Sequence, residues 1–263
     1  MITEDTAQRD GSTAPALLGP ALVTGAGRGI GRAIATRLAA MGAPVCLSAR
    51  SRDELEETAT TIARDGGEAL VIPCDITAED AAEQLVARAA EELGGIAVLV
   101  NNAGGAHRVA ELDALERRDF ARGTELNYGA VYRTMHAAAP HLFAAAPDAV
   151  VLNIVSIAAE RGMAGMSYYS GAKAGVVALS KTAAREWGPR GVRVNCLGPG
   201  WIETELSRPL RESREFTTAT LGQVPLGRWG TAEEVADVAA FLVSSAARYV
   251  TGTTVYVDGG LLA

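Results

Sequence analysis

The sequence predicts an α/β fold in which helices cover both faces of a parallel β-sheet. From Ala21 onward, short β-branched runs alternate with longer alanine-rich segments of helical periodicity. The expected strands are near-continuous apolar runs, as is typical of parallel strands that are buried on both sides. Seven strands alternating with helices imply right-handed crossovers and a doubly wound sheet.

The expected elements follow this alternation along the chain. The strands are Ala21–Thr24, Pro44–Ala49, Glu68–Cys74, Ile96–Asn101, Ala149–Val155, Val192–Leu197 and Thr253–Val257. The helices are Gly29–Met41, Asp53–Arg64, Ala78–Leu93, Phe120–Ala145, Tyr168–Trp187 and Ala232–Ser245. No repeat or break in composition divides the chain, so we expect a flexible N-terminus (1–16) and a single domain (17–263). Its longest irregular stretch, about 198–230, is expected to be a lid or binding loop.

Composition excludes several classes of function. The chain has 263 residues, is 48% hydrophobic and carries a formal net charge of -7. An acidic chain of this kind is repelled by polyphosphate backbones, so no nucleic-acid partner is expected. The first sixteen residues lack the basic start and apolar middle of a secretory signal. No apolar stretch approaches the roughly 18 residues of a membrane span, so we expect a cytoplasmic protein with no membrane partner.

The cysteines and histidines do not suggest a metal site. Cys46, Cys74 and Cys196 are widely spaced, and only three histidines are present. No Cys-x-x-Cys or mixed Cys/His spacing occurs, and the odd number of cysteines argues against a disulfide framework. Each cysteine adjoins an apolar or β-branched run and is interpreted as a small buried hydrophobe.

A glycine-rich loop joins the first expected strand to the first helix. Gly25, Gly29 and Gly31 stand at G-x-x-x-G-x-G spacing, which differs from the commoner G-x-G-x-x-G. Glycine lets the backbone approach a pyrophosphate closely, and the helix that follows offers free N–H groups to the anion. An ordinary glycine-rich turn is the alternative. The position at the first strand–helix junction favours a dinucleotide site of the Rossmann type.

The end of the second expected strand bears on the choice of cofactor. NAD-specific folds usually place a carboxylate about 20 residues beyond the glycines, where it binds the ribose hydroxyls. Here the strand ends in Ala49 and Arg50, without a carboxylate. Arg50 and the loop residue Arg28 could grip a 2′-phosphate instead. The sequence therefore favours NADP(H) over NAD(H), the alternative being that both arginines are simply solvated.

Tyr169 and Lys173 stand four residues apart in an expected helix, which places them on one helical face. A free tyrosine has a pKa near 10, and an ammonium about 4 Å away is worth roughly 4 kcal/mol at an effective dielectric of 20. One lysine could therefore tune the phenol toward neutral pH. Small residues surround the pair, which suggests that a partner helix or the nicotinamide packs closely there: Gly171, Ala172, Ala174, Gly175 and Ala178.

Polar residues also follow two expected strands at the edge where ligands of open α/β sheets bind. Ser156 comes directly after Val150–Val155, and its hydroxyl could hydrogen-bond a substrate carbonyl. An ordinary strand-end cap is the alternative. Asn101–Gly104 closes the fourth strand in the same layer.

Together these residues resemble the short-chain dehydrogenase/reductase family over nearly the whole chain, from Leu18 to Gly260. The motifs fall in the family's order, and Tyr169 follows Ser156 at the family's usual interval: Thr24–Gly31, Asp75, Asn101–Gly104, Ser156, Tyr169 with Lys173, and Pro199-Gly200. The resemblance implies hydride transfer between a nicotinamide dinucleotide and a carbonyl/alcohol pair. It also implies a homotetramer or homodimer that pairs the helices holding Asn127 and Tyr169, with Tyr256–Gly260 in the tetramer contact.

The resemblance assigns roles to individual residues. Tyr169 would be the general acid in reduction, Lys173 would lower its pKa and hold the nicotinamide ribose, and Ser156 would steady the carbonyl. Asn127 would bend its helix and support a water relay to Lys173. The cofactor would be bound by Gly25, Arg28, Gly29, Ile30, Gly31, Arg50, Asp75 at the adenine, Ile76, Asn102, Ala103, Gly104, Tyr169, Lys173, Pro199, Gly200, Ile202 and Thr204. Tyr168 is not assigned the catalytic role, because Ala172 rather than lysine lies four residues beyond it.

Substrate choice is expected in Gly105–Glu111, Ile157–Met166 and Trp201–Val224. The stretches Gly198–Leu210 and Pro225–Gly230 are similar to gluconate 5-dehydrogenase-like members of the family, which suggests a sugar acid, a polyol or another small polar ketone. A 3-ketoacyl thioester or secondary-metabolite ketoreductase is the alternative enzyme. A dinucleotide-sensing module without catalysis is the non-enzymatic alternative, although such proteins tend to lose the tyrosine or lysine that this chain keeps.

Overall fold

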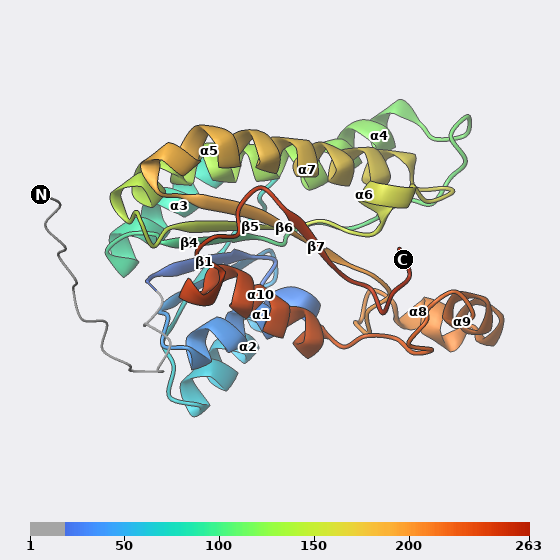
Figure 1. The fold of residues 1–263 in the computed structure, drawn as a ribbon, viewed down its shortest axis with the longest axis horizontal. Helices are drawn as coiled ribbons and strands as arrows, with labels where there is room; N and C mark the ends of the chain where they lie inside the picture. The colour runs from blue at the N-terminus through green and yellow to red at the C-terminus, as the bar shows by residue number, and fades with distance from the viewer. Residues whose placement is uncertain (1–18) are drawn as a thin grey trace, which may run out of the picture.

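The computed structural model describes residues 19–263 and has a parallel sheet at its centre (Figure 1). The sheet has seven strands in the order β3-β2-β1-β4-β5-β6-β7, which confirms the predicted doubly wound α/β fold. The strands are β1 (Ala21–Thr24), β2 (Val45–Ala49), β3 (Ala69–Pro73), β4 (Val98–Asn101), β5 (Val150–Ile154), β6 (Arg193–Pro199) and β7 (Thr254–Val257). The predicted flexible terminus, residues 1–16, lies outside the described part of the chain.

Helices cover both faces of this sheet, as Figure 1 shows. On one face pack α1 (Gly29–Ala40), α2 (Arg52–Arg64) and α10 (Ala232–Val243), whose apolar residues form one core cluster with the strands. On the other pack α3 (Ala81–Leu93), α5 (Ala130–Ala144) and α7 (Ser167–Trp187), which form the second cluster. Burial on both sides explains why β1, β4 and β5 are uniformly apolar apart from Thr24, Asn101 and Asn153. Within residues 19–263, no helix combines the length and apolar character needed to cross a bilayer.

The predicted helix over Phe120–Ala145 is wrong as a single regular element. The chain forms α4 (Arg117–Thr124), then a π-helical segment (Glu125–Gly129), and only then α5. Most of the predicted strands begin or end a residue or two outside the observed ladder, whereas β6 continues to Pro199. Four-residue α6 (Ala158–Arg161) and two short 3₁₀ turns, at Gly188–Arg190 and Ser245–Ala247, were not predicted.

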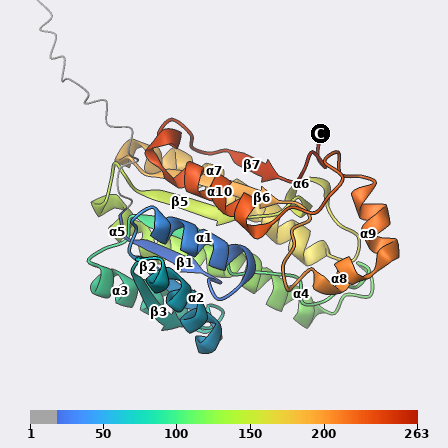
Figure 2. The ribbon, with the colours of Figure 1, turned by 90° about the horizontal axis from the view of Figure 1, so that it is seen from below.

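The segment predicted to be irregular, about 198–230, contains two short helices. These are α8 (Arg208–Glu212) and α9 (Arg214–Leu221), and the Ser213 hydroxyl caps α9 by accepting from the Phe216 N–H. Figures 1 and 2 place α8 and α9 at the same end of the molecule as α6. That end is where β5 and β6 terminate. The proposed lid role of this segment stays a prediction.

The topology fixes where a ligand can bind. Strand order reverses between β1 and β4, because the chain builds outward from β1 to β3 and then returns to place β4 on the other side of β1. At such a switch point the connections leave in opposite directions and open a crevice at the carboxyl ends of the strands. The glycine loop after β1 and Asn102 after β4 therefore face the same crevice.

Arg193, the first residue of β6, holds the last helix against the sheet. Its guanidinium donates to the carbonyls of Leu242, Val243 and Ser244 at 2.8–3.2 Å and to that of Val250 at 3.3 Å. The first three belong to the C-terminal turn of α10, where carbonyls lack partners within the helix. Partial burial lowers the pKa of this guanidinium.

We expect Arg193→Leu to lower the free energy of unfolding by about 2–4 kcal/mol, because several part-buried carbonyls lose a charged donor at once. Urea unfolding followed by circular dichroism measures this directly. Arg64→Leu is the matched control, since Arg64 pairs only with its exposed neighbour Asp65. Equal midpoints for the two variants would show that Arg193 does not anchor α10.

Candidate functional site

The glycine loop between β1 and α1 is shaped as a cradle. Gly25 and Gly29 adopt φ of +67° and +55°, which side chains of L-residues disfavour. A Cβ on Gly31 would overlap the Gly25 carbonyl and the Asn102 amide, so α1 can start this close to the loop only with glycine there. The Arg28 side chain does not cap α1, so the helix N–H groups remain available to an anion. The loop thus fits a dinucleotide pyrophosphate.

The end of β4 is fastened to this loop by hydrogen bonds. The Thr24 hydroxyl accepts from the backbone N–H groups of Asn102 at 3.0 Å and Ala103 at 3.1 Å. The Asn102 side chain donates to the carbonyls of Thr24 and Gly25 at 3.0 and 3.1 Å. The structure therefore brings together the first and fourth strand ends that the sequence predicted to line one cleft.

Asn127 is buried at the centre of the π-helical segment. Its side-chain amide donates to the carbonyls of Gly105 at 3.0 Å and Gly123 at 2.9 Å, and its oxygen accepts from the Gly105 N–H at 2.9 Å. The bond to Gly123 takes a carbonyl one turn earlier in the same helix, which accounts for the widened ladder at this point. Asn127 thus shapes its own helix and also fixes the loop after β4.

Tyr169 and Lys173 lie on one face of α7, as their spacing predicted. The Lys173 ammonium is 5.7 Å from the centre of the Tyr169 ring and donates to the Ile154 carbonyl, the last residue of β5, at 2.8 Å. A Cβ on Gly104 would lie 2.7 Å from the Asn127 side-chain oxygen and 3.2 Å from the Lys173 Nζ. Helix α7, the π-helical segment and the loop after β4 therefore converge at Gly104, where only a residue without a side chain fits.

Burial governs the acid–base properties of this pair. It raises the pKa of Tyr169, and a hydrogen bond with Ser156 offsets this only in part. It lowers the pKa of Lys173 from 10.5 to about 8. The expected lowering of the tyrosine pKa by the lysine is absent here. The physical reason is that the ammonium is bonded to the Ile154 carbonyl, while desolvation of the phenol dominates.

Ser156 sits at the carboxyl end of β5, in hydrogen-bonding reach of Tyr169. Its hydroxyl also accepts from the Ala158 N–H at 3.1 Å and so caps the turn into α6. The two interpretations drawn from the sequence, strand-end cap and partner in a reactive site, thus apply to the same side chain.

Tyr168 has a structural role that the sequence did not reveal. It is buried, and its hydroxyl accepts from the N–H groups of His107 at 2.8 Å and Arg108 at 3.1 Å while donating to the Arg108 carbonyl. Its ring fills the space beside Gly123, where a Cβ would overlap it. Tyr168 therefore anchors the loop beyond Gly105, and Tyr169 remains the tyrosine that faces Ser156.

Two further predicted cofactor residues, Asp75 and Ile76, follow the carboxyl end of β3. Asp75 accepts from the N–H and hydroxyl of Thr77, and these bonds lower its pKa. Ile76 is buried next to it, and its carbonyl accepts from Arg133 at 3.1 Å.

The segment after β6 reaches back over the glycine loop. The Gly200 N–H donates to the Val257 carbonyl at 2.9 Å, and Ile202 forms a bridge with Gly230. A Cβ on Gly29 would lie 3.4 Å from the Thr204 side chain. Thr204 thus lies against Gly29 of the cradle, and the role predicted for Pro199 to Thr204 in covering the nicotinamide stays a prediction.

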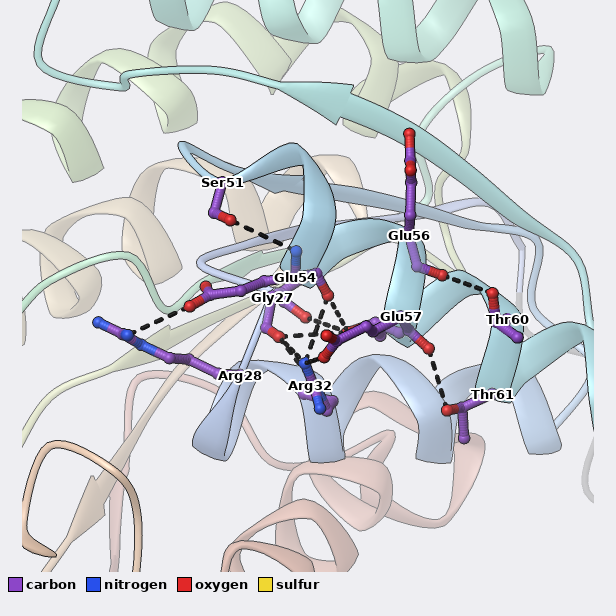
Figure 3. Close-up of polar contacts among 11 residues, drawn as sticks. Gly27, Arg28, Arg32, Ser51, Glu54, Glu56, Glu57, Thr60 and Thr61 are labelled. Carbon is purple, nitrogen blue, oxygen red and sulfur yellow. Dashed lines mark hydrogen bonds and ion pairs between the residues drawn. The ribbon is translucent and has the colours of Figure 1, made fainter.

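The two arginines predicted to hold a 2′-phosphate differ in their surroundings. Arg50 is exposed at the end of β2 and forms no ion pair with the described residues. Arg28 pairs with Glu54 of α2 at 3.2 Å, a contact that Figure 3 shows beside Gly27 and Arg32. The sequence analysis missed Glu54. Its signal was the spacing of Ser51 and Glu54, which is typical of a helix N-terminus.

No cluster of three or more His, Cys, Asp or Glu side chains suited to a metal ion occurs within residues 19–263. Cys46 and Cys196 are buried and Cys74 is partly buried, all as free thiols. Burial raises the pKa of Cys46 to about 12, so this thiol stays protonated.

Known proteins match this chain along most of its length. A family model described as enoyl-(acyl carrier protein) reductase matches residues 25–262. Gluconate 5-dehydrogenase of Gluconobacter oxydans is 36% identical over 241 residues, covering 92% of this chain and 93% of that protein. The 3-oxoacyl-(acyl-carrier-protein) reductase of Pseudomonas aeruginosa is 38% identical, with 92% and 96% covered. A crystal structure with bound NADP, of an Agrobacterium tumefaciens protein provisionally named 2-deoxy-D-gluconate 3-dehydrogenase, has a TM-score of 0.86 and 39% identity, with 93% and 96% covered.

The lowered pKa of Lys173 predicts a pH-dependent stability. The unfolded chain keeps this proton up to pH 10.5, whereas the native protein loses it near pH 8. Between these values the unfolded state binds more protons, so the free energy of unfolding rises with pH. We expect wild type to gain about 2 kcal/mol relative to Lys173→Met between pH 7.5 and 9.5. Urea titrations at several pH values test this, and parallel curves for the two proteins would contradict it.

Proposed function

The chain belongs to the short-chain dehydrogenase/reductase family, and we propose that it interconverts a ketone and a secondary alcohol, with Tyr169 as the general acid/base. The observation that carries this proposal is the convergence of Lys173 and Asn127 on Gly104, beside the glycine cradle, with the Tyr169 ring centre 5.7 Å from the Lys173 ammonium. A nicotinamide dinucleotide, when bound, supplies or accepts the hydride. The protein's own residues then have to supply one proton to the carbonyl oxygen, or remove it in the reverse direction.

The residues divide this task between them. The raised pKa of Tyr169 keeps its phenol protonated at neutral pH, which is the form that can donate to a ketone oxygen. Ser156 would hydrogen-bond the same oxygen and orient it. Lys173 would hold the nicotinamide ribose, and Asn127 acts as a positioning residue that would support a water relay to Lys173. A dinucleotide sensor would not need this proton-donating arrangement.

We propose NADP(H) as the preferred cofactor. Arg50 stands at the end of β2, where NAD-specific folds carry a carboxylate, and its exposed guanidinium is free to bind a 2′-phosphate. The related Agrobacterium protein was crystallised with NADP, which supports this preference.

For the substrate we propose a sugar acid, a polyol or a similar small polar ketone. Two of the relatives described above are named for gluconate or deoxygluconate. A 3-oxoacyl thioester is the second candidate, and one feature favours it besides the Pseudomonas relative. Leu206, which is 65% exposed, lies next to Gly105 beside the cleft, and Val109 is 71% exposed near Gly165. Such apolar side chains suit an acyl chain better than a sugar acid.

We also propose a homotetramer or homodimer that pairs α7 with its copy. A hollow of about 270 Å³ lies on the outer side of this helix, bordered by Gly171, Gly175, Tyr128 and half-exposed Phe120. A facing helix could approach closely over Gly171, where a Cβ would meet nothing within 4 Å, whereas the Tyr128 ring already packs against Gly175. The C-terminal residues Tyr256–Gly260 are proposed to contribute to the tetramer.

Neighbouring tyrosines provide a matched test of the catalytic role. We expect Tyr169→Phe to lower kcat/KM on the order of 10²–10⁴-fold, because the proton donor is lost, with the fold intact. Tyr168→Phe should instead lower the free energy of unfolding by about 1–3 kcal/mol, since two N–H groups lose their acceptor. The rates are read from nicotinamide absorbance and the stabilities from urea unfolding. Comparable rate losses in both variants would remove Tyr169 from the acid/base role.

The cofactor and substrate proposals are tested together by binding and turnover. We expect NADPH to bind more tightly than NADH by nicotinamide fluorescence, and Arg50→Gln to weaken NADPH binding about tenfold or more while sparing NADH. Equal affinity of the wild-type protein for both nucleotides would contradict the NADP(H) preference. A panel holding 5-ketogluconate and an acetoacetyl thioester then separates the two substrate candidates.

A further inference from the structure

The guanidinium of Arg28 is already engaged by a carboxylate. Arg28 Nη1 lies 3.2 Å from Glu54 Oε1, and the Glu54 side chain is about two-thirds buried against the loop. The other carboxylate oxygen would lie 3.0 Å from a Cβ on Gly27, and Ala49 at the end of β2 borders the same spot. Glu54 therefore occupies the space between the glycine loop and the end of β2, and Figure 3 shows its side chain reaching Arg28.

This space is where the adenosine ribose of a Rossmann-bound dinucleotide is expected. A 2′-phosphate brings close to two negative charges there and would compete with Glu54 for Arg28. It would also be repelled by the carboxylate itself. The ribose of NAD(H) carries only hydroxyls at this point and meets neither obstacle.

The Glu54 carboxylate has an alternative hydrogen-bond partner at the start of its own helix, the N–H of the N-cap residue Ser51. Glu54 is the third residue of α2, and its N–H donates to the hydroxyl of the N-cap Ser51 at 3.3 Å. Thr231 and Glu234 have the same spacing in α10, where the glutamate also accepts from the N-cap N–H at 2.8 Å and completes a capping box. At α2 this second bond is not made, and no described residue accepts from the Ser51 N–H. Released from Arg28, the Glu54 carboxylate can complete the box.

We infer that Glu54 is a residue that affects nucleotide specificity. Its carboxylate pairs with Arg28 until a 2′-phosphate displaces that carboxylate, and this competition moderates the chain's preference for NADP(H). The inference rests on the proposed NADP(H) function, and adds to it a residue that opposes the phosphate. The ion pair is exposed on the Arg28 side, so its release costs little, and the unused capping bond lowers that cost further.

The test uses Glu54→Gln, because glutamine can still complete a capping box but cannot form the ion pair. Adenosine 2′,5′-bisphosphate and adenosine 5′-monophosphate are titrated into the full-length protein by calorimetry, so that the probes differ by the 2′-phosphate alone. We expect Glu54→Gln to bind the bisphosphate about two- to fivefold more tightly and the monophosphate unchanged. Glu57→Gln is the control: it removes the same charge from the same helix, but its partner is Arg32.

Arg28→Gln distinguishes a failure of the Glu54 inference from a failure of the NADP(H) proposal. This variant should bind the bisphosphate more weakly, and adding Glu54→Gln to it should not increase its affinity for the bisphosphate. If Arg28→Gln weakens binding of the bisphosphate while Glu54→Gln alone leaves that binding unchanged, the Glu54 inference fails, but the proposed role of the arginines in phosphate binding is retained. If neither Arg28→Gln nor Arg50→Gln changes the bisphosphate, the NADP(H) proposal itself fails. Weaker monophosphate binding by Glu54→Gln would falsify the inference by showing that the carboxylate binds the ribose.

Discussion

The Asn127 carboxamide is fully buried, so its donors and its acceptor need partners within the protein, and they find them on two separate segments. Bonds to both backbone groups of Gly105 fix the loop that follows β4, and the bond to Gly123 opens the helix that carries Asn127. The loop in turn places Gly104 against Lys173. One side chain therefore sets the distance between the cofactor edge of β4 and the reactive face of α7. Tyr168 of α7 adds a second link, through its bonds to His107 and Arg108 further along the same loop.

Desolvation disfavours the charged form of both Tyr169 and Lys173. It raises the pKa of Tyr169 and lowers that of Lys173. A neutral phenol is the form that can give a proton, which is the step that the proposed reduction of a carbonyl requires. Oxidation of an alcohol needs the phenolate, and thus a nearby positive charge that offsets burial. In this structure the Lys173 ammonium is held by the Ile154 carbonyl instead.

The sequence predicted the sheet and the shared helical face of Tyr169 and Lys173 because both depend on short-range rules. Continuous apolar runs identified the strands, and the four-residue spacing of Tyr169 and Lys173 identified one helical face. The break in the helix around Asn127 was not predicted from its periodicity, because it arises from a side-chain hydrogen bond to the Gly123 carbonyl, which a pattern of apolar residues does not reveal. The role of Tyr168 was missed because its partners at His107 and Arg108 lie about sixty residues away. Helices α8 and α9 are only five and eight residues long, too short for a pattern of apolar residues to identify them, so their segment was predicted to be irregular.

The reaction class is easier to infer than the specificity, because the cofactor cradle is built mainly from backbone groups whereas specificity depends on exposed side chains. The cradle consists of glycine conformations, helix N–H groups and the bonds joining Thr24 to Asn102, so few sequences can form it and those few are recognisable. The proposed choice of nucleotide and substrate would depend instead on exposed side chains such as Arg50, Arg28 and Leu206, which many sequences can supply. Their effect depends on what pairs with them, and an exposed pair such as Arg28–Glu54 costs little to form or break. Small changes at these positions can therefore redirect specificity while the hydride-transfer frame stays intact.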